Sequence, residues 1–297
     1  MKAAVVSKYG SPEGIQIIDI EKPTPKPNEL LIKVHATTVT FGDAMLRRMG
    51  FPSRILLGLF MGGLRRGKIL GHEFAGEIEA VGEEVTLFKP TDRVFASAGM
   101  KGGAHVEYIC LPEDSMVSIK PANMTFEEAA AVPVGGNTAL DILRRADIQD
   151  GQRVLIYGAS GSVGSYAVQL AKHWGAEVTG VTTDAEMMRS LGTDRVTNYR
   201  EEDFTESGET YDVIFDAVRK LSSSKSKTAL KENGVFLSAS SSTEQKAENL
   251  GFLGELIEDG KLKAVIDRRY PLEEIVEAHR YVDTGRKKGN VVITLTQ

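Results

Sequence analysis

Short apolar runs, separated by polar and turn-forming residues, fill the first 120 residues of the chain. Five of them have the length of strands: Ile15–Ile20, Glu29–His35, Phe74–Val81, Arg93–Ala98 and His105–Leu111. Glycine, proline and charged residues break the chain between them, and segments with a helical repeat are scarce. The pattern predicts a β-rich, barrel-like domain.

Near Pro121 the pattern changes, and helical and strand-like segments alternate from there to about residue 265. Thr125 and Glu128 have the spacing of a capping box at the start of an alanine-rich helix. Strand candidates follow at 154–157, 177–182, 194–197, 212–216 and 234–239. Because helices and strands alternate, we predict an α/β fold with a doubly wound parallel sheet.

The last thirty residues contain a helical segment near Leu272–Val282 and a strand-like segment near Asn290–Leu295. Such a terminal strand could return to the β-rich domain. A length of 297 residues also favours two domains over one core. We therefore predict a β-rich domain of residues 1–121, completed by 266–297, and an α/β domain of residues 122–265.

The junction at residues 153–164 has the pattern of a buried strand, a turn of small residues and the start of a helix. Small residues let the backbone approach a pyrophosphate, and the free N–H groups of the helix start face its charge. Gly164 lets the helix pack closely on the strand. Ala159 stands where the usual fingerprint has its first glycine, but a strand at 177–182 follows at the distance of a βαβ unit. This junction predicts a dinucleotide site.

Composition excludes several classes of protein. The net charge of −5 makes nucleic acid an improbable main partner. The single cysteine forbids an internal disulfide and any zinc site built from several cysteines. No apolar stretch is long enough to span a bilayer, and the first residues do not resemble a signal peptide. We expect a soluble, cytoplasmic protein.

Several motifs, in order, resemble the medium-chain dehydrogenase/reductases, specifically the zinc-free quinone-oxidoreductase (zeta-crystallin-like) branch. They stand at 71–82, 92–94, 102–108, 129–133, 159–164 and 289–292. The resemblance implies a GroES-like catalytic domain and a Rossmann nucleotide-binding domain. It also implies hydride transfer from NAD(P)H to a quinone, an enone or alkenal, or a related carbonyl compound, hence a small, apolar, electrophilic substrate.

Zinc-containing members of this superfamily hold their metal with cysteine and histidine. His72 and Glu73 remain here, but Phe41-Gly42-Asp43 stands where the first cysteine is expected, and no thiolate occurs in residues 133–138. One histidine with scattered carboxylates cannot complete a tetrahedral site for a soft metal. We predict no catalytic metal and interpret His72 as a hydrogen-bonded histidine.

Without a metal, hydrogen-bond donors must stabilise the charge that develops on the substrate oxygen. By resemblance, Thr40 and Asp43 are the catalytic candidates, and Thr40 occupies a position where relatives often carry asparagine. Asp43 is more simply explained as the cap of a helix at Ala44–Met49. Tyr9 and Tyr108 could also supply a phenol. The apolar segment 51–66 could be a lid over the substrate, a packing insertion or a membrane-surface segment.

The resemblance implies a set of cofactor-binding residues. They are Thr138, Ala159, Ser160, Gly161, Ser162, Val163, Gly164, Thr182, Thr183, Tyr199, Asp216, Val218 and Asn290.

The choice between NADPH and NADH depends on the end of the second strand of the α/β domain, where an acid would repel a 2′-phosphate. Thr182 and Thr183 tolerate a phosphate, whereas Asp184 stands near the position of the NADH-binding acid. Arg189 and Arg200 are the nearest basic residues. We predict NADPH as the cofactor and keep NADH as the alternative.

The chain departs from the family in length. It is a couple of residues short between Thr183 and Glu186, and about thirty short between Ser238 and Gln245, judged from the usual length of two-domain relatives. The second gap would remove the sixth strand of the sheet, the edge through which relatives commonly dimerise. Two explanations are open: a natural deletion, or residues omitted at this point with the remainder numbered continuously. The serine run joins Thr243 directly, which favours an omission. Thr91 and Arg219 stand where glycine is common.

An alternative function comes from another class. A chain with this cofactor junction and no convincing catalytic donor could be an NADPH-binding sensor or structural protein with little turnover. A homodimer through the nucleotide-binding domain is a further expectation.

Overall fold

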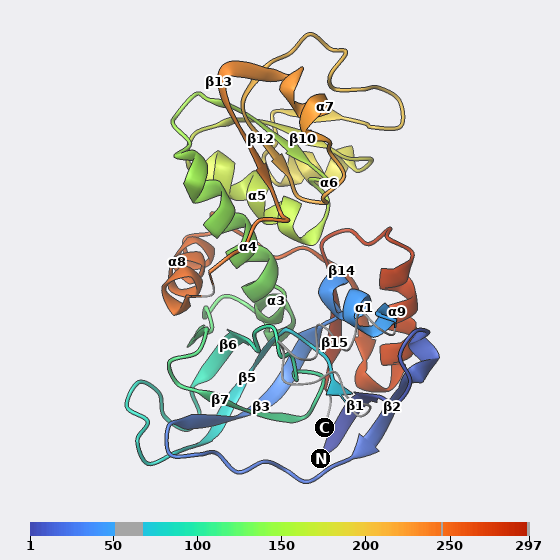
Figure 1. Ribbon diagram of the computed structural model, residues 1–297. Coiled ribbons are helices and arrows are strands. Elements are labelled where there is room, and N and C mark those ends of the chain that lie inside the picture. The colour runs from blue at the N-terminus through green and yellow to red at the C-terminus, as the bar shows by residue number, and fades with distance from the viewer. Residues whose placement is uncertain (51–67, 245, 296–297) are drawn as a thin grey trace. The chain divides into compact units, whose positions relative to one another are not determined.

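The computed structural model describes residues 1–50, 68–244 and 246–295 (Figure 1). The chain divides into two compact units. The first comprises residues 1–134, 246–254 and 266–297, and the second comprises residues 135–245 and 255–265. In the described part of the chain, no helix has the length and apolar character needed to cross a membrane.

Most strands of the first unit form one seven-stranded sheet, with the order β14-β15-β3-β5-β6-β8 and β7 paired to β3. Their bounds are β3 Glu29–Thr38, β5 Glu73–Val81, β6 Arg93–Ser97, β7 Tyr108–Pro112, β8 Val117–Ile119, β14 Ile266–Pro271 and β15 Asn290–Thr294. The C-terminal strand β15 pairs antiparallel with β3. The expectation that the end of the chain returns to the β-rich domain is therefore confirmed.

A second, three-stranded sheet has the order β2-β1-β4. It consists of β1 Lys2–Val6, β2 Ile15–Asp19 and β4 Lys68–Ile69. The described residues of this unit also form the α-helices α1 Phe41–Arg48, α3 Phe126–Ala130 and α9 Ile275–Asp283, and short 3-10 helices lie at Pro12–Gly14 and Leu272–Glu274. As its sequence predicts, α3 begins with a capping box formed by Thr125 and Glu128.

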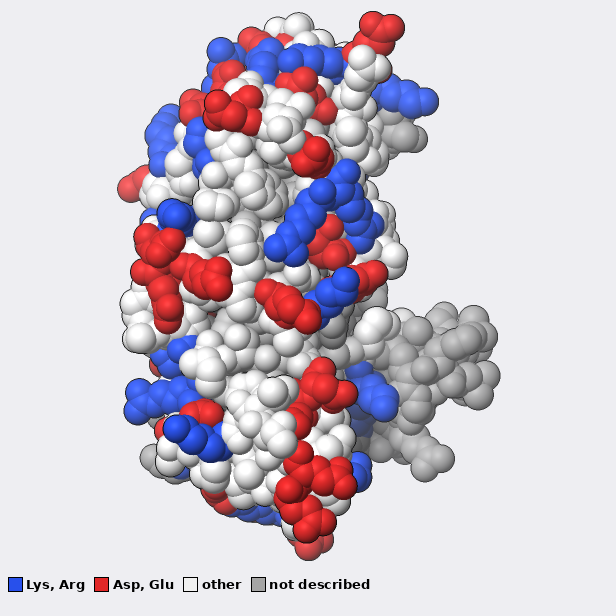
Figure 2. Space-filling model, turned by 90° about the vertical axis from the view of Figure 1, so that its left-hand side faces the viewer, with Lys and Arg blue, Asp and Glu red and all other residues white. Residues whose placement is uncertain are grey.

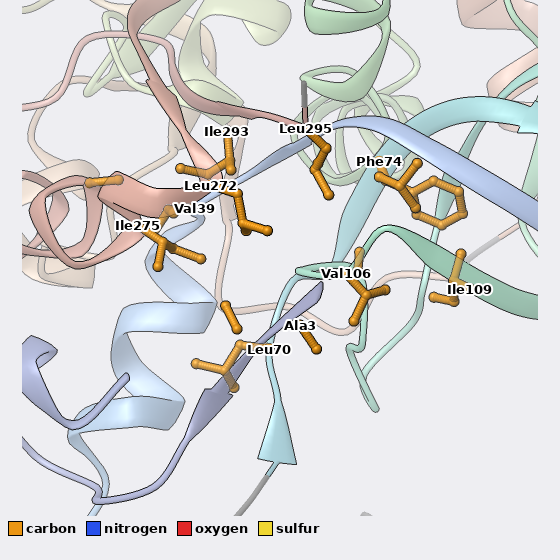
Figure 3. Close-up of a cluster of buried hydrophobic side chains, with 14 of the residues drawn as sticks. Ala3, Val39, Leu70, Phe74, Val106, Ile109, Leu272, Ile275, Ile293 and Leu295 are labelled. Carbon is orange, nitrogen blue, oxygen red and sulfur yellow. The ribbon is translucent and has the colours of Figure 1, made fainter. Parts of the chain in front are cut away.

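The core of the first unit joins segments from both ends of the chain. Figure 3 shows buried apolar side chains from β1, β5, α9 and β15 in one cluster, among them Ala3, Phe74, Ile275 and Ile293. Each of these four side chains is at most 1 % exposed. Full burial of such side chains stabilises the folded state by roughly 1.5–3 kcal/mol for each large one, so the C-terminal segment is an integral part of this unit.

Thr91, in the turn between β5 and β6, has a φ of 75°, in the left-handed region that favours glycine. We expect Thr91→Gly to raise the free energy of unfolding by about 0.5–1 kcal/mol, because relief of the strain exceeds the larger entropy loss of glycine. Urea denaturation measures the change. Thr91→Ala is the control, since alanine keeps the strained φ; an equal gain in both variants would contradict the explanation.

In the second unit, a five-stranded parallel sheet has the order β11-β10-β9-β12-β13. The strands are β9 Arg153–Tyr157, β10 Glu177–Val181, β11 Arg195–Thr197, β12 Tyr211–Asp216 and β13 Leu230–Ser238. The chain runs outward from β9 to β11 and then crosses to β12 and β13. Ligands of such sheets bind at the carboxyl ends of the strands where this reversal occurs, which places the end of β9 at the expected position.

Helices of the second unit include α5 Ser162–His173, α6 Ala185–Ser190 and α7 Ser223–Lys227, and a 3-10 helix lies at Arg144–Ala146. Helices α4 Pro133–Leu143 and α8 Ala247–Glu258 contribute residues to both units. The α/β fold with a doubly wound sheet is confirmed. Among the residues that the structure describes, this sheet has no sixth strand, and β13 is its edge.

Charged side chains of both signs are interspersed on the face of the molecule that Figure 2 shows. Oppositely charged side chains of the described residues also form pairs, as in the contacts of Lys172 with Asp194 at 2.7 Å and of Lys231 with Asp212 at 2.8 Å. Such exposed pairs contribute about 0–1 kcal/mol each. They keep the local charge mixed rather than contributing much to stability.

Candidate active site

The turn after β9 is built from backbone hydrogen bonds. The N–H groups of Gly158 and Ala159 both donate to Val181 O, at 3.0 and 3.2 Å, which ties the turn to the end of β10. Gly161 is the N-cap of α5 and supplies no side-chain cap. Because the N-cap of this twelve-residue helix is a glycine, it offers no side-chain acceptor to the N–H groups of the first turn, and a helix start of this kind can bind a phosphate.

Gly164 is required by packing rather than by its backbone angles. A Cβ at this position would lie 2.3 Å from Gly158 O and 2.8 Å from Ala159 Cα. These distances are far below van der Waals contact, so any side chain would push α5 away from the turn. The role predicted for the third glycine of the fingerprint is confirmed in its geometry.

Several other predicted cofactor residues lie beside this turn. The Thr182 hydroxyl donates to Ser160 Oγ at 2.7 Å, and the Thr182 N–H donates to Thr197 O. Val218 packs on Gly158, where a Cβ would lie 2.4 Å from Val218 Cγ1. The Asp216 carboxylate accepts from the N–H groups of Val218 and Leu221, so it shapes the loop after β12.

Asp184, the residue that argued for NADH, is the N-cap of α6. Its Oδ1 accepts from the Met187 N–H at 3.1 Å, and its own N–H donates to Thr182 Oγ1. The carboxylate thus has a structural function at the helix start, where a negative charge is favourable.

Tyr199 follows β11 and is 52 % exposed. It lines a hollow of about 210 Å³ together with Tyr157, Arg200, Phe204 and Lys225. Glu201, Glu202 and Asp203 also line it, so the hollow combines aromatic rings with groups of both charges, and Lys225 is paired with Asp203 at 2.5 Å.

Two further predicted cofactor residues belong to other elements. Thr138 is half-buried on α4, in the second unit. Asn290 is buried at the start of β15, in the first unit. Arg219 has a φ of 60°, so it occupies a backbone conformation that favours glycine, as its departure from the family pattern indicated.

Thr40 and Asp43 meet at the start of α1. Thr40 is the N-cap: its Oγ1 accepts from the Asp43 N–H at 3.1 Å, and Asp43 Oδ2 accepts from the Thr40 N–H at 2.8 Å and hydroxyl at 2.6 Å. The interpretation of Asp43 as the cap of a helix at Ala44–Met49 is therefore corrected. The helix begins three residues earlier, because Thr40 caps it and Asp43 closes the capping box.

Asp43 also binds the ring of His72. Its Oδ1 lies 2.7 Å from His72 Nδ1 and accepts from the Gly71 N–H at 2.8 Å. Burial would raise the pKa of Asp43, but the His72 ring and the hydrogen bonds hold it well below its usual range. Burial alone would lower the pKa of His72. The charge of Asp43 and its hydrogen bond outweigh burial, so the pKa of His72 is raised above its ordinary value.

Gly71 permits this contact. It has a φ of +95°, and a Cβ there would lie 2.6 Å from His105 Cδ2. Glycine alone fits between His105 and the Asp43–His72 pair, and its conformation directs the N–H toward Asp43.

Glu73, which follows His72 and is the first residue of β5, is fully buried. Its two oxygens accept from the Thr38 hydroxyl at 2.5 Å and the Val134 N–H at 2.6 Å. Burial raises the pKa of Glu73 to about 7, against the opposing effect of these hydrogen bonds. Both oxygens of this carboxyl are occupied, and it fastens the start of α4 to the sheet.

The other histidines of this unit serve packing. His105 is buried, and its Nε2 lies 3.0 Å from Thr38 O. His35 stacks on Phe126 with 4.2 Å between ring centroids. His279 is buried beside Arg47, and burial is the main reason that its pKa falls to about 3.

The residues present do not fit a zinc site. Among the described residues, no group of three His, Cys, Asp or Glu side chains is arranged to hold a metal ion. His72 Nδ1 and both oxygens of Asp43 and Glu73 already have protein partners. The thiol of Cys110 lies on β7, and burial raises its pKa to about 11, away from the thiolate that zinc requires.

The sequence predicts a hydrogen-bonded His72, and the structure contains that hydrogen bond. Its partner Asp43, and the proximity of Thr40, were not predicted. The sequence feature that could have indicated this pair is the presence of His72 and Glu73 without the cysteines of a zinc site. The proposed lid at 51–66 lies outside the described residues.

Family models of known proteins match much of the chain. A family model described as Alcohol dehydrogenase GroES-like domain matches residues 26–121, and two described as Zinc-binding dehydrogenase match residues 162–258 and 231–293. The word zinc in these descriptions does not agree with the side chains found here.

Two relatives and one solved structure align along nearly the whole chain. The chloroplastic NADPH-dependent alkenal/one oxidoreductase of Arabidopsis thaliana is 30 % identical, over 99 % of this chain and 79 % of its own length. The quinone oxidoreductase of Homo sapiens is 30 % identical, over 96 % of this chain and 94 % of its own length. The quinone oxidoreductase structure from Coxiella burnetii has a TM-score of 0.89 at 29 % identity, covering 100 % of this chain and 99 % of that one.

The alignment with the human protein extends over 322 positions, more than the 297 residues of this chain. The relative therefore carries residues that have no counterpart here, in agreement with the shortness expected from the sequence. On the fold, the turn after β9 and these similarities, the chain belongs to the medium-chain dehydrogenase/reductase family, in its quinone oxidoreductase branch.

Proposed function

We propose that the protein is an NADPH-dependent reductase that acts on a quinone, an enone or alkenal, or a related carbonyl compound without a metal. The observation that carries the proposal is the uncapped start of α5 behind the turn at residues 158–161. It is the kind of site that a pyrophosphate occupies, and the relatives named for alkenal/one and quinone reduction support the substrate class.

The residues present fit a nicotinamide dinucleotide. Backbone N–H groups of residues 162–164 would hold the pyrophosphate, and Ser160, Thr182, Thr183 and Val218 would lie along the cofactor from the ends of β9, β10 and β12. When bound, this cofactor supplies the hydride. Thr138, Tyr199, Asp216 and Asn290 remain part of the proposed site, Asp216 by shaping its loop.

Loss of absorbance at the reduced nicotinamide band, with 1,4-naphthoquinone, 3-buten-2-one and hexanal as acceptors, tests the proposal. We expect NADPH consumption that depends on at least one of these acceptors. Tight NADPH binding without consumption by any of them would instead favour a sensor or structural protein.

We infer NADPH rather than NADH because Asp184 is committed to capping α6. Asp184→Ser keeps a good N-cap, so we expect the ratio of kcat/KM for NADPH over NADH to change by less than about threefold. Steady-state kinetics with both cofactors measure this ratio. A tenfold rise in favour of NADPH would identify Asp184 as the residue that discriminates.

Three finer features belong to the same proposal. Residues 1–121 with 266–297 form the catalytic domain, and 122–265 the nucleotide-binding domain. The protein is cytoplasmic. It forms a homodimer through the nucleotide-binding domain, where the edge strand β13 exposes Val235; light scattering after size exclusion tests the oligomeric state.

A further inference from the structure

The reduction of an enone needs a proton as well as a hydride. Addition of hydride to the β-carbon leaves an enolate, and a proton must then form the second new bond at the α-carbon or on oxygen. This inference rests on the proposed function, and it concerns which side chain of the first unit provides that proton.

Most polar groups near Thr40 are already committed. Both oxygens of Glu73 accept hydrogen bonds in a fully buried position, and His105 uses Nε2 to contact a backbone carbonyl. The Thr40 hydroxyl donates to Asp43 Oδ2 and accepts from the Asp43 N–H. Asp43 itself has no exposed surface. These side chains cannot reach a substrate without breaking the contacts that hold them.

His72 differs from them in its exposure and in its second ring nitrogen. Its side chain is 14 % exposed, and Asp43 holds Nδ1 at 2.7 Å. The other ring nitrogen, Nε2, makes no hydrogen bond within the described part of the chain. A histidine with one nitrogen fixed by a buried carboxylate and the other available is the arrangement of an acid–base group.

Asp43 is fixed in turn. Its oxygens accept from the Thr40 N–H, the Thr40 hydroxyl and the Gly71 N–H, all within 2.8 Å. The carboxylate therefore cannot rotate away from the ring, and its charge favours the imidazolium form. Thr40 and Asp43 are thus positioning residues.

We propose that His72 is the proton donor of the reductase, oriented by Asp43. The Nε2–H bond of the imidazolium breaks, the proton bonds to the enolate carbon or oxygen, and the neutral imidazole takes a proton from water. Together with the hydride, this gives the saturated ketone and leaves the protein unchanged.

The charged groups that act on His72 are Asp43 and Glu73, which raise its pKa, and Lys68, which lowers it. His105 interacts with the same Asp43. Because the net pKa of His72 is raised and the acid form is the reactive one, kcat should fall as the pH rises through that pKa, above the ordinary value of about 6.5.

The test compares 3-buten-2-one reduction by the wild type, His72→Gln, Asp43→Asn and His35→Gln across pH 5.5–9, a range set by the ordinary histidine pKa of about 6.5. We expect His72→Gln to lower kcat about 100-fold at pH 7, to change the Kd of NADPH by less than about threefold, and to lose the alkaline fall. Asp43→Asn keeps the imidazole, and its alkaline fall should move to lower pH. His35→Gln, a matched change on β3, should retain the wild-type profile.

If His72→Gln keeps kcat within threefold and the same alkaline fall, His72 is not the donor. If it fails to fold, as judged by circular dichroism and NADPH binding, an unshifted profile in Asp43→Asn contradicts the proposal in its place. A wild type that binds NADPH but reduces neither enone nor quinone contradicts the proposed function itself, and this inference with it.

Discussion

Replacing Arg47 with methionine should lower the free energy of unfolding by about 3 kcal/mol. The side chain is fully buried although it carries a charge. Its guanidinium donates to Gly10 O, His279 Nδ1 and Asp283 Oδ2, so it joins α1 to α9 and to the loop after β1. Methionine fills a similar volume but leaves these acceptors without a donor. The effect falls at the low end for a broken buried pair because Asp283 is 24 % exposed and regains water.

Arg48 provides a matched control on the same helix. It is 44 % exposed and lies 3.7 Å from Asp283, so Arg48→Met should cost less than about 1 kcal/mol. Urea unfolding followed by circular dichroism gives both values, and hydrogen exchange in α1 and α9 shows where stability is lost. Equal effects of the two substitutions would mean that the buried network contributes nothing beyond surface charge.

Features decided by local sequence were predicted correctly. The strand Arg153–Tyr157, the small-residue turn and the start of α5 follow from residues that are neighbours in the chain. The capping box at Thr125 is equally local. Short-range sterics and hydrogen bonding determine such features, so their patterns are visible in the sequence.

Features decided by contacts between distant segments were missed. The capping box of Thr40 and Asp43 is local, but Asp43 is also held by Gly71 and His72, 28 and 29 residues away. The burial of Arg47 depends on Asp283, 236 residues further along the chain. No periodicity or spacing in the sequence indicates that these distant residues contact one another. The acid–base pair could therefore be recognised only after the pairing of β3 with β5 was known.

Gly161→Val should weaken NADPH binding at least about tenfold, or by about 1.4 kcal/mol, while leaving the protein folded. Gly161 has φ −76° and ψ 174°, which valine can adopt, and its Cβ would meet only Gly158 O, at 3.3 Å. The added side chain instead occupies space where a pyrophosphate would approach the N–H groups of α5. Isothermal titration gives the Kd, and thermal unfolding should change by no more than about 2 °C, equivalent to less than 1 kcal/mol.

Gly164→Ala separates packing from cofactor contact. Here the Cβ would lie 2.3 Å from Gly158 O, so the strand and helix must move apart, at a cost of about 1–3 kcal/mol in unfolding free energy. The two glycines should thus give opposite results: Gly161→Val loses affinity at nearly constant stability, and Gly164→Ala loses stability first. Unchanged NADPH affinity in Gly161→Val would show that the phosphates bind elsewhere. The uncapped start of α5 would then be an ordinary helix end and not the cofactor site.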